Sequence, residues 1–268
     1  MFYRNIPLLP AKAAGRAPAA ALAVLTSSES KRLIAKAVAA LPEVRNALRS
    51  GYVVIGLGTT NAFVAEEITG TKIDPKVRYA AGIIYEGKRE PSPPRQRMQP
   101  FVLHRGRPVE LAPAKAVEEF GPDDVYFKGA NAVDSMGTAG VLMGNPQGGI
   151  AITMQITAAR GSHLIMPIGL EKLVPSVDEV APHLAVHRYK YSTGPNTALL
   201  PLRNADVLTE IQAVKVLTGA TAFHVASGGI GGSEGSVVLV IEGDDAAVEQ
   251  AWAIIKGIKG EPPVAGPA

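Results

Sequence analysis

Three glycine-containing segments of this sequence carry polar residues that could hold a small ligand. The first, residues 56–61, reads Gly-Leu-Gly-Thr-Thr-Asn and stands between an apolar stretch and a helical pattern. Backbone N–H groups at a helix N-terminus, with threonine hydroxyls beside them, form a binding site for anions such as phosphate. The candidate ligand-binding residues in this segment are Gly56, Gly58, Thr59, Thr60 and Asn61.

This first segment differs from the common phosphate-binding fingerprints. Asn61 stands where the last glycine of the dinucleotide-binding pattern would be, and the lysine of a P-loop is missing. The same residues could also form a tight strand-to-helix turn capped by Thr59 or Thr60. The glycine pair and the hydroxyl pair occur together, which favours a ligand over a plain turn.

The second candidate segment reads Lys-Gly-Ala-Asn at residues 128–131 and follows a predicted strand. Open α/β sheets bind ligands at the C-terminal ends of their strands. Lys128 offers a positive charge, and Gly129 and Asn131 offer an open backbone and an amide. Asp134 is the best remaining acid or base nearby, so Asp134 and Lys128 are the candidate catalytic residues. The alternative is a loop with an Asn turn and a surface lysine.

The third candidate segment, residues 144–149, precedes a predicted helix and again places open backbone at a helix N-terminus. A proline-glycine turn is the alternative interpretation of this segment. The candidate ligand-binding residues are Asn145, Gln147, Gly148, Gly149 and, within the helix, Gln155.

A fourth glycine-rich segment, residues 228–235, is similar to a dinucleotide fingerprint but lies between two predicted strands, which favours a hairpin. Glu234 is the only residue there that could act as a nucleophile or base. Among the histidines, only His183 and His187 are spaced like metal ligands, and Pro182 opposes their sharing a helix. The sequence therefore predicts neither a metal nor a cofactor.

The composition excludes several other functions. The chain has 268 residues, no cysteine, 5% aromatic residues and a formal net charge of +3. The lack of cysteine excludes disulfides, thiolate zinc sites and a cysteine nucleophile. Weak charge and scarce aromatics argue against nucleic-acid binding, and no apolar run is long enough to span a bilayer. We expect a cytoplasmic protein that binds a small anionic metabolite, with no nucleic acid and no membrane as partners.

Hydrophobic periodicity and turn signals predict the elements that must position these residues. A Thr26–Glu29 capping box opens the first helix. Predicted helices cover residues 26–41, 43–49, 62–68, 114–120, 150–159, 170–174, 207–217 and 246–258. Predicted strands cover residues 52–55, 78–85, 101–103, 108–111, 124–127, 163–168, 186–191, 198–202, 220–227 and 237–242, and residues 88–99 are predicted to be a loop.

This order of elements predicts an α/β fold in two domains. Residues 1–25 form an N-terminal extended arm, and residues 26–182 form an α/β ligand-binding domain with a Rossmann-like three-layer sheet. Residues 183–260 form a smaller ferredoxin-like α+β domain, and residues 261–268 form a tail. The three candidate segments all fall in the larger domain.

The motifs resemble, at a remote level, those of ribose-5-phosphate isomerases, which share a superfamily with glucosamine-6-phosphate deaminases and CoA transferases. The segment 56–61 resembles the isomerases' Gly-x-Gly-Thr-Gly-Ser-Thr, and Lys-Gly-Ala-Asn-Ala at 128–132 stands where they have Asp-Gly-Ala-Asp-Glu. Gly-Gly-Ile-Ala-Ile-Thr at 148–153 resembles their Gly-Gly-Ala-Ala-Leu-Thr, and the order of the motifs agrees. The resemblance implies a sugar-phosphate cleft and a smaller ferredoxin-like domain.

The catalytic residues that the resemblance would imply are replaced in this chain. Lys128 and Asn131 stand for the two motif aspartates, Pro146 for the catalytic lysine and Gln155 for the general-base glutamate. Glutamine cannot accept a proton reversibly near neutral pH, so the isomerase route to proton abstraction is closed. The phosphate-type segment and the glycine-lined cleft are retained.

Three classes of function stay open. The first is binding of a phosphorylated, sugar-phosphate-like metabolite, with isomerase-like or transferase-like activity on a different catalytic set. The second is a CoA transferase or acyl-CoA hydrolase that uses Glu234 as nucleophile. The third is a non-catalytic sensor or scaffold. Dimers and tetramers are common among similar folds, so a homo-oligomer also stays open.

Overall fold

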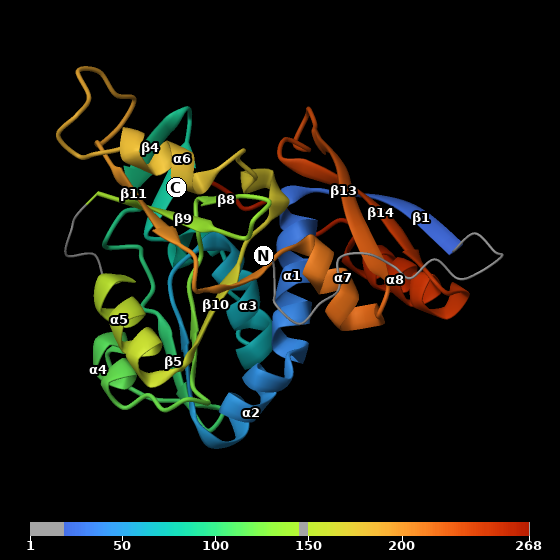
Figure 1. The fold of residues 1–268 in the computed structure, drawn as a ribbon, viewed down its shortest axis with the longest axis horizontal. Coiled ribbons are helices and arrows are strands. Elements are labelled where there is room, and N and C mark those ends of the chain that lie inside the picture. The colour runs from blue at the N-terminus through green and yellow to red at the C-terminus, as the bar shows by residue number, and fades with distance from the viewer. Residues whose placement is uncertain (1–18, 145–149, 268) are drawn as a thin grey trace.

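The computed structural model describes residues 19–144 and 150–267, which form an α/β fold with mixed sheets (Figure 1). The largest sheet of the described residues has the strand order β12-β10-β7-β2-β5-β6. Its first four strands are parallel to one another, and β5 and β6 add an antiparallel hairpin at the edge. The bounds of these strands are β2 (Tyr52–Ile55), β5 (Phe101–His104), β6 (Arg107–Pro108), β7 (Val125–Phe127), β10 (His163–Pro167) and β12 (Asp206–Leu208).

Helices pack on both faces of this sheet (Figure 1). On one side, α1 contacts β10, α3 contacts β2 and α7 contacts β12, while α4 and α5 lie on the other side. The helix α2 packs at one end, against β2, β5 and β7. The bounds of the helices are α1 (Ser27–Ala40), α2 (Pro42–Ser50), α3 (Thr59–Thr69), α4 (Pro113–Glu118), α5 (Ile150–Arg160) and α7 (Glu210–Thr218).

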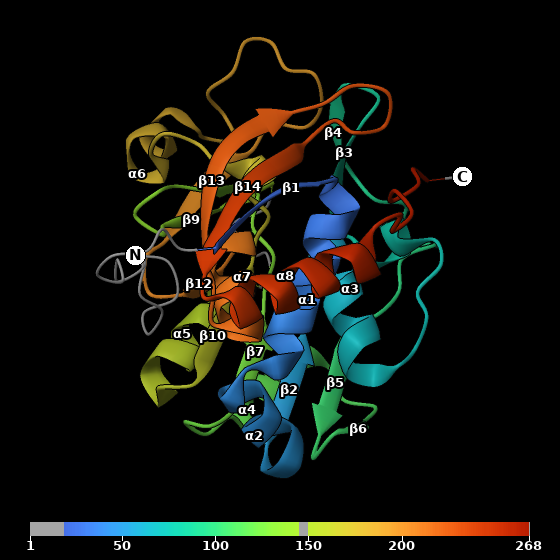
Figure 2. The ribbon, with the colours of Figure 1, turned by 90° about the vertical axis from the view of Figure 1, so that its right-hand side faces the viewer.

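Smaller sheets surround this assembly. An antiparallel sheet of order β1-β14-β13 carries the helix α8 on one face (Figure 2). A second sheet has the order β11-β9-β8, and β3 pairs with β4 as a separate hairpin. Their bounds are β1 (Ala19–Leu25), β3 (Gly82–Tyr85), β4 (Lys88–Pro91), β8 (Ala132–Val133), β9 (Ala139–Met143), β11 (Ala198–Leu202), β13 (Thr221–Gly228) and β14 (Ser236–Gly243), and the remaining helices are α6 (Val177–Val180) and α8 (Asp245–Ile258).

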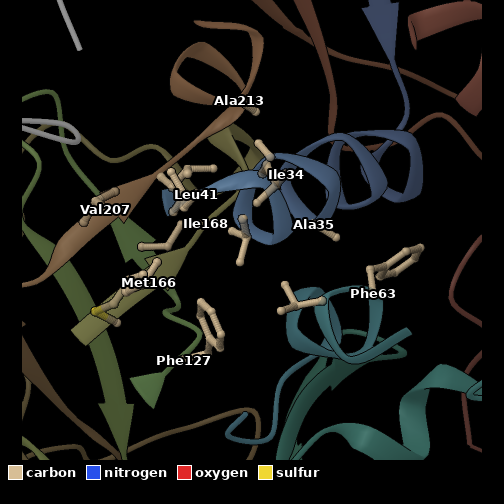
Figure 3. Close-up of a cluster of buried hydrophobic side chains, with 14 of the residues drawn as sticks. Ile34, Ala35, Leu41, Phe63, Phe127, Met166, Ile168, Val207 and Ala213 are labelled. Atoms are coloured by element: carbon tan, nitrogen blue, oxygen red, sulfur yellow. The ribbon is translucent and has the colours of Figure 1, made fainter. Parts of the chain in front are cut away.

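The core lies where α1 crosses the sheet between α3 and α7 (Figure 3). Ile34 of α1, Phe63 of α3 and Phe127 of β7 are fully buried. Ile34 and Phe127 lie on the side of Met166 and Val207, on the neighbouring strands β10 and β12, whereas the Phe63 ring lies on the opposite side of α3 (Figure 3). Burial of each large apolar side chain stabilises the fold by about 1.5–3 kcal/mol, so this contact holds the helices firmly on the sheet.

The helix α1 begins as its capping box predicts. The Glu29 amide donates to Thr26 Oγ1 at 3.3 Å, and the Thr26 amide donates to Glu29 Oε2 at 2.9 Å. These reciprocal bonds satisfy two N–H groups that have no partner within a helix. The prediction of this helix start is confirmed.

Other predicted elements are wrong in detail, chiefly where pairing depends on distant residues. Within residues 88–99, predicted to be a loop, β4 forms because it pairs with β3. No strand is present at residues 186–191. The helix predicted over 207–217 begins at Glu210, because the residues before it pair with β10 as β12. The strands β8 and β9 were not anticipated, because short runs take their conformation from their partners.

Strand pairing also crosses the predicted domain limits. The strand β1, from the predicted arm, pairs with β14 in the small sheet. The strands β11 and β12 lie within residues 183–260 but pair with β9 and β10. Among the described residues, no helix is long and apolar enough to cross a membrane.

Candidate functional site

The N-terminus of α3 lies beside the end of β7 because two adjacent parallel strands end there. The Gly56 amide donates to the Phe127 carbonyl at 2.9 Å, and a Cβ on Gly56 would lie 2.8 Å from that oxygen. Only glycine permits this approach without displacement of backbone. Asn61 then ties the same turn, because its Nδ2 donates to the carbonyls of Gly56 at 2.7 Å and Phe127 at 3.3 Å.

These contacts change the roles expected for Gly56 and Asn61. Asn61 is fully buried and does not line the cavity described below. Gly56 likewise shapes the turn and is not among the lining residues. Both residues therefore position the helix N-terminus, and the surfaces open to a ligand belong to Gly58, Thr59 and Thr60.

A cavity of about 180 Å³, the small cavity, lies at this helix N-terminus. Its walls bring together the first two candidate segments, which are far apart in the sequence. Its polar and glycine lining residues are Gly58, Thr59, Thr60, Gly82, Arg89, Lys128, Gly129, Asn131 and Lys172. The third segment cannot be compared, since residues 145–149, including Asn145, Gln147, Gly148 and Gly149, lie outside the described residues.

Two lysines face the small cavity without a carboxylate partner. Lys128 Nζ donates to the Gly129 carbonyl at 3.1 Å, and Lys172 Nζ donates to the Ala130 carbonyl at 3.0 Å. In the described part of the chain, neither ammonium forms an ion pair with a carboxylate. Burial lowers the pKa of Lys128 to about 8. Burial and the positive charges of Lys31 and Lys128 lower the pKa of Lys172 to about 8, although Glu171 and Glu210 act in the opposite direction.

Thr60 adds an unsatisfied polar group to the same cavity. Its side chain is 2% exposed, and its Oγ1 has no hydrogen-bond partner within the described residues. A buried hydroxyl without a partner costs about 1–3 kcal/mol, so a ligand oxygen there would be favourable. Thr59 lies beside it in the first turn of α3, where the amide N–H groups are open.

Arg89 and Asn131 complete the small cavity but are already bonded. Arg89 donates to the carbonyls of Pro195 and Asn196. Asn131 Oδ1 accepts from the Leu142 amide at 3.0 Å, which leaves its Nδ2 as a donor for a ligand. Sequence reasoning missed Arg89 because it occurs in a stretch predicted to be a loop.

Asp134 and Gln155 lie elsewhere. Asp134 is 2% exposed, and its carboxylate accepts from the amides of Met136, Thr138 and Val177 at 2.9–3.0 Å. It fixes a turn and does not line the cavity, so we do not retain it as an acid or base. Gln155 is exposed on α5 and lines neither cavity.

A larger cavity of about 560 Å³ adjoins the small one. The two cavities adjoin along a wall of six shared residues and are together called the cleft. The shared residues are Thr59, Gly82, Ile83, Ile84, Asn131 and Lys172. The other walls of the larger cavity come from the start of α1, the strand β3, the loop between β13 and β14, and residues 263–267. Glu234 lies in this wall, and its Oε2 accepts from the Gly232 amide at 2.9 Å.

Lys172 is the functional candidate that sequence reasoning missed. It ends a 3-10 turn, Leu170–Lys172, shortly after the parallel strand β10. The rule that ligands bind beyond the C-terminal ends of parallel strands could have identified it. Residues 170–174 were instead predicted to be only a short helix.

No protein-family model matches this chain, and no curated protein sequence is similar to it. The function must therefore be argued from the cleft.

Proposed function

We propose that this protein binds a small phosphorylated metabolite, with the phosphate in the small cavity. One observation carries the proposal: two ammonium groups without carboxylate partners face the first turn of a helix inside one cavity. Buried charges are normally paired, and an unpaired cluster is stabilised by a counter-ion. A phosphate dianion would accept from the N–H groups of α3, from Thr60 and from Lys128, and Lys172 would add a second positive charge nearby.

The larger cavity supports an organic group attached to that phosphate. It continues directly from the small cavity and offers both apolar walls, such as Ile83 and Ile84, and polar ones. A free inorganic anion would leave it empty. A sugar phosphate or another phosphorylated metabolite of similar size fits a cleft with a cationic end and a mixed body.

We also propose a remote relation to the superfamily of ribose-5-phosphate isomerases, glucosamine-6-phosphate deaminases and CoA transferases. The parallel strands β12-β10-β7-β2 with helices on both faces support a Rossmann-like larger part. The antiparallel sheet β1-β14-β13 with α8 supports a ferredoxin-like smaller part. In this sheet β1, from the start of the chain, pairs with β14 where a strand from residues 183–260 was expected. A cytoplasmic location and a homo-oligomer remain part of this proposal.

The test compares ligand-induced thermal stabilisation of the wild type and two variants. We expect phosphorylated sugars to raise the melting temperature, and Lys128→Met and Lys172→Met each to abolish most of that rise, because each removes one positive charge from the site. Lys256→Met, at an exposed position on α8, should leave the stabilisation unchanged. The proposal is overturned if no phosphorylated metabolite stabilises the wild type, or if the lysine variants respond as the wild type does.

A second candidate function is a CoA transferase or acyl-CoA hydrolase with Glu234 as nucleophile. The specific support is that Glu234 lines the larger cavity, beside the cationic end that could take a phosphate of CoA. A glutamyl-CoA thioester on Glu234, found by mass spectrometry after incubation with acyl-CoA and absent in Glu234→Gln, would establish it. Absence of the adduct from the wild type would remove this candidate.

A further inference from the structure

Lys172 is one of the six residues that line both cavities, and it is the one among those six with an ionisable side chain. Its backbone is fixed by the 3-10 turn after β10, where the Lys172 amide donates to the Gly169 carbonyl at 3.0 Å. Its ammonium is held at the wall by the 3.0 Å bond to the Ala130 carbonyl. A ligand that spans the two cavities would therefore lie against the shared wall to which Lys172 belongs.

Among the described residues, no carboxylate forms an ion pair with Lys172, although the charges of Glu171 and Glu210 act to raise its pKa. Glu171 is bonded to Lys31 at 2.7 Å. Glu210 is fully buried and accepts from the Leu170 amide at 2.9 Å, and desolvation raises its pKa, which favours its neutral form. Lys31 and Lys128 add positive charge. The amine is thus easier to deprotonate than an exposed lysine, and roughly a tenth is neutral at pH 7 when its pKa is about 8.

We propose that Lys172 is an amine nucleophile that forms an imine with the carbonyl group of a phosphorylated aldose or ketose. The proposal rests on the proposed function, because the phosphate must be held by α3 and Lys128 for the carbonyl to meet Lys172. An amine placed next to another cationic group and partly withdrawn from water is a recognised form of activated nucleophile.

The step balances without any further reactant. The nitrogen lone pair of neutral Lys172 attacks the carbonyl carbon, so that a C–N bond forms and the carbonyl oxygen takes a proton. The resulting carbinolamine loses its hydroxyl as water when the C–O bond breaks. Both hydrogens of the amine leave with that oxygen, and the product is a C=N bond.

Geometry assigns the two lysines to different parts of the ligand. Lys128 lines only the small cavity, and it precedes Gly129, which packs against the N-terminus of α3. A Cβ on Gly58 would lie 3.9 Å from the Gly129 Cα. Lys128 is therefore the phosphate-side cation. Lys172 also faces the larger cavity, which receives the carbon chain.

The test uses matched pairs of probes that differ only in the carbonyl group. Dihydroxyacetone phosphate and ribose 5-phosphate carry it, and glycerol 3-phosphate and ribitol 5-phosphate carry an alcohol in its place. After incubation and borohydride reduction, peptide mass spectrometry should find a reduced adduct on Lys172 with at least one carbonyl probe. Excess of the matched alcohol should suppress the adduct, because both compete for the phosphate site.

Two variants provide the controls. Lys172→Arg keeps the positive charge but lacks a nucleophilic amine, so it should still be stabilised by the alcohol probe and should form no adduct. Lys128→Arg should keep the adduct on Lys172.

The imine is overturned if the alcohol probes stabilise the wild type but no carbonyl probe labels Lys172, or if label spreads equally over exposed lysines. The phosphate site would survive that result. If no probe of either kind stabilises or labels the wild type, the proposed function fails as well. Labelling of Lys172 that the alcohols do not suppress would overturn the placement of the phosphate.

Discussion

At the scale of single residues, Lys128 and Lys172 should make the proposed phosphate binding depend on pH. Affinity should rise through about pH 6, where a phosphate monoester becomes a dianion. It should then fall as pH rises through about 8, because the free protein loses the lysine protons there and the charged amines bind the anion. Above the lysine pKa, each lysine that must take up a proton before it binds the anion weakens the affinity roughly tenfold per pH unit. Titration calorimetry with glycerol 3-phosphate across this pH range measures both the rise in affinity at about pH 6, the lower limb, and the fall at about pH 8, the upper limb.

The control for this pH profile is a variant whose cations do not titrate. In the double variant Lys128→Arg and Lys172→Arg, the guanidinium groups stay charged to far higher pH, so the upper limb should disappear while the lower limb remains. A wild-type affinity that stays constant between pH 7 and about 9.5 would contradict the assignment of the two lysines as the cations that attract the phosphate.

At the scale of elements, the junction of β2, β7 and α3 depends on Gly56. Gly56→Ala should destabilise the protein by about 1–3 kcal/mol, because its Cβ would meet the Phe127 carbonyl at 2.8 Å and backbone must move. Gly58→Ala is the matched control, since its Cβ would meet nothing closer than 3.9 Å. Urea unfolding measures the stability of the two variants. Equal free energies of unfolding would contradict the dependence of the junction on Gly56.

The same elements show how much sequence alone could predict. The strand Tyr52–Ile55, the start of α1 and the end of α3 at Gly70 follow from local signals, namely an apolar run, a capping box and a glycine with positive φ. The contact between residues 56–61 and 128–131 was also predictable, because both follow parallel strands.

What could not be predicted depends on partners distant in the chain. The strand β11 was assigned to the smaller part because its pairing with the distant β9 leaves no local trace. The strand β4 is different, because its partner β3 is only two residues away and the hairpin was missed locally. The sequence does not show that the Asp134 carboxylate accepts from backbone amides, because one of them, the Val177 amide, is distant in the chain. Lys172 was missed because burial and charge around a lysine are properties of the folded chain.

At the scale of the whole molecule, one ion-pair network joins three distant parts of the chain. Arg32 of α1 contacts Glu66 of α3 at 2.6 Å, Glu67 of α3 at 3.0 Å and Glu261 of the C-terminal segment at 2.9 Å. All four side chains are largely withdrawn from water, so their hydrogen bonds are stronger than those of exposed pairs.

Because this network holds the start of the C-terminal segment, its loss should let that segment detach before the sheets unfold. Glu261→Gln should weaken the bonds to Arg32 by about 1.5 kcal/mol and speed hydrogen exchange at Val264–Gly266 roughly tenfold, with β14 unaffected. Glu118→Gln, which removes an exposed pair with Lys115, should leave exchange at Val264–Gly266 unchanged. Equal exchange at Val264–Gly266 in Glu261→Gln and the wild type would show that the segment is held by other contacts.

The C-terminal segment that walls the larger cavity belongs to no sheet. Glu261 anchors its start, and Gly266 packs so closely on the Tyr85 ring that a Cβ would lie 2.3 Å from Cε2. Between these anchors Val264 packs against the buried core, whereas the exposed Pro263 and Ala265 only line the cavity. Substitutions at Pro263 and Ala265 would therefore change the fit of the proposed ligand while the strands and the core stay as they are.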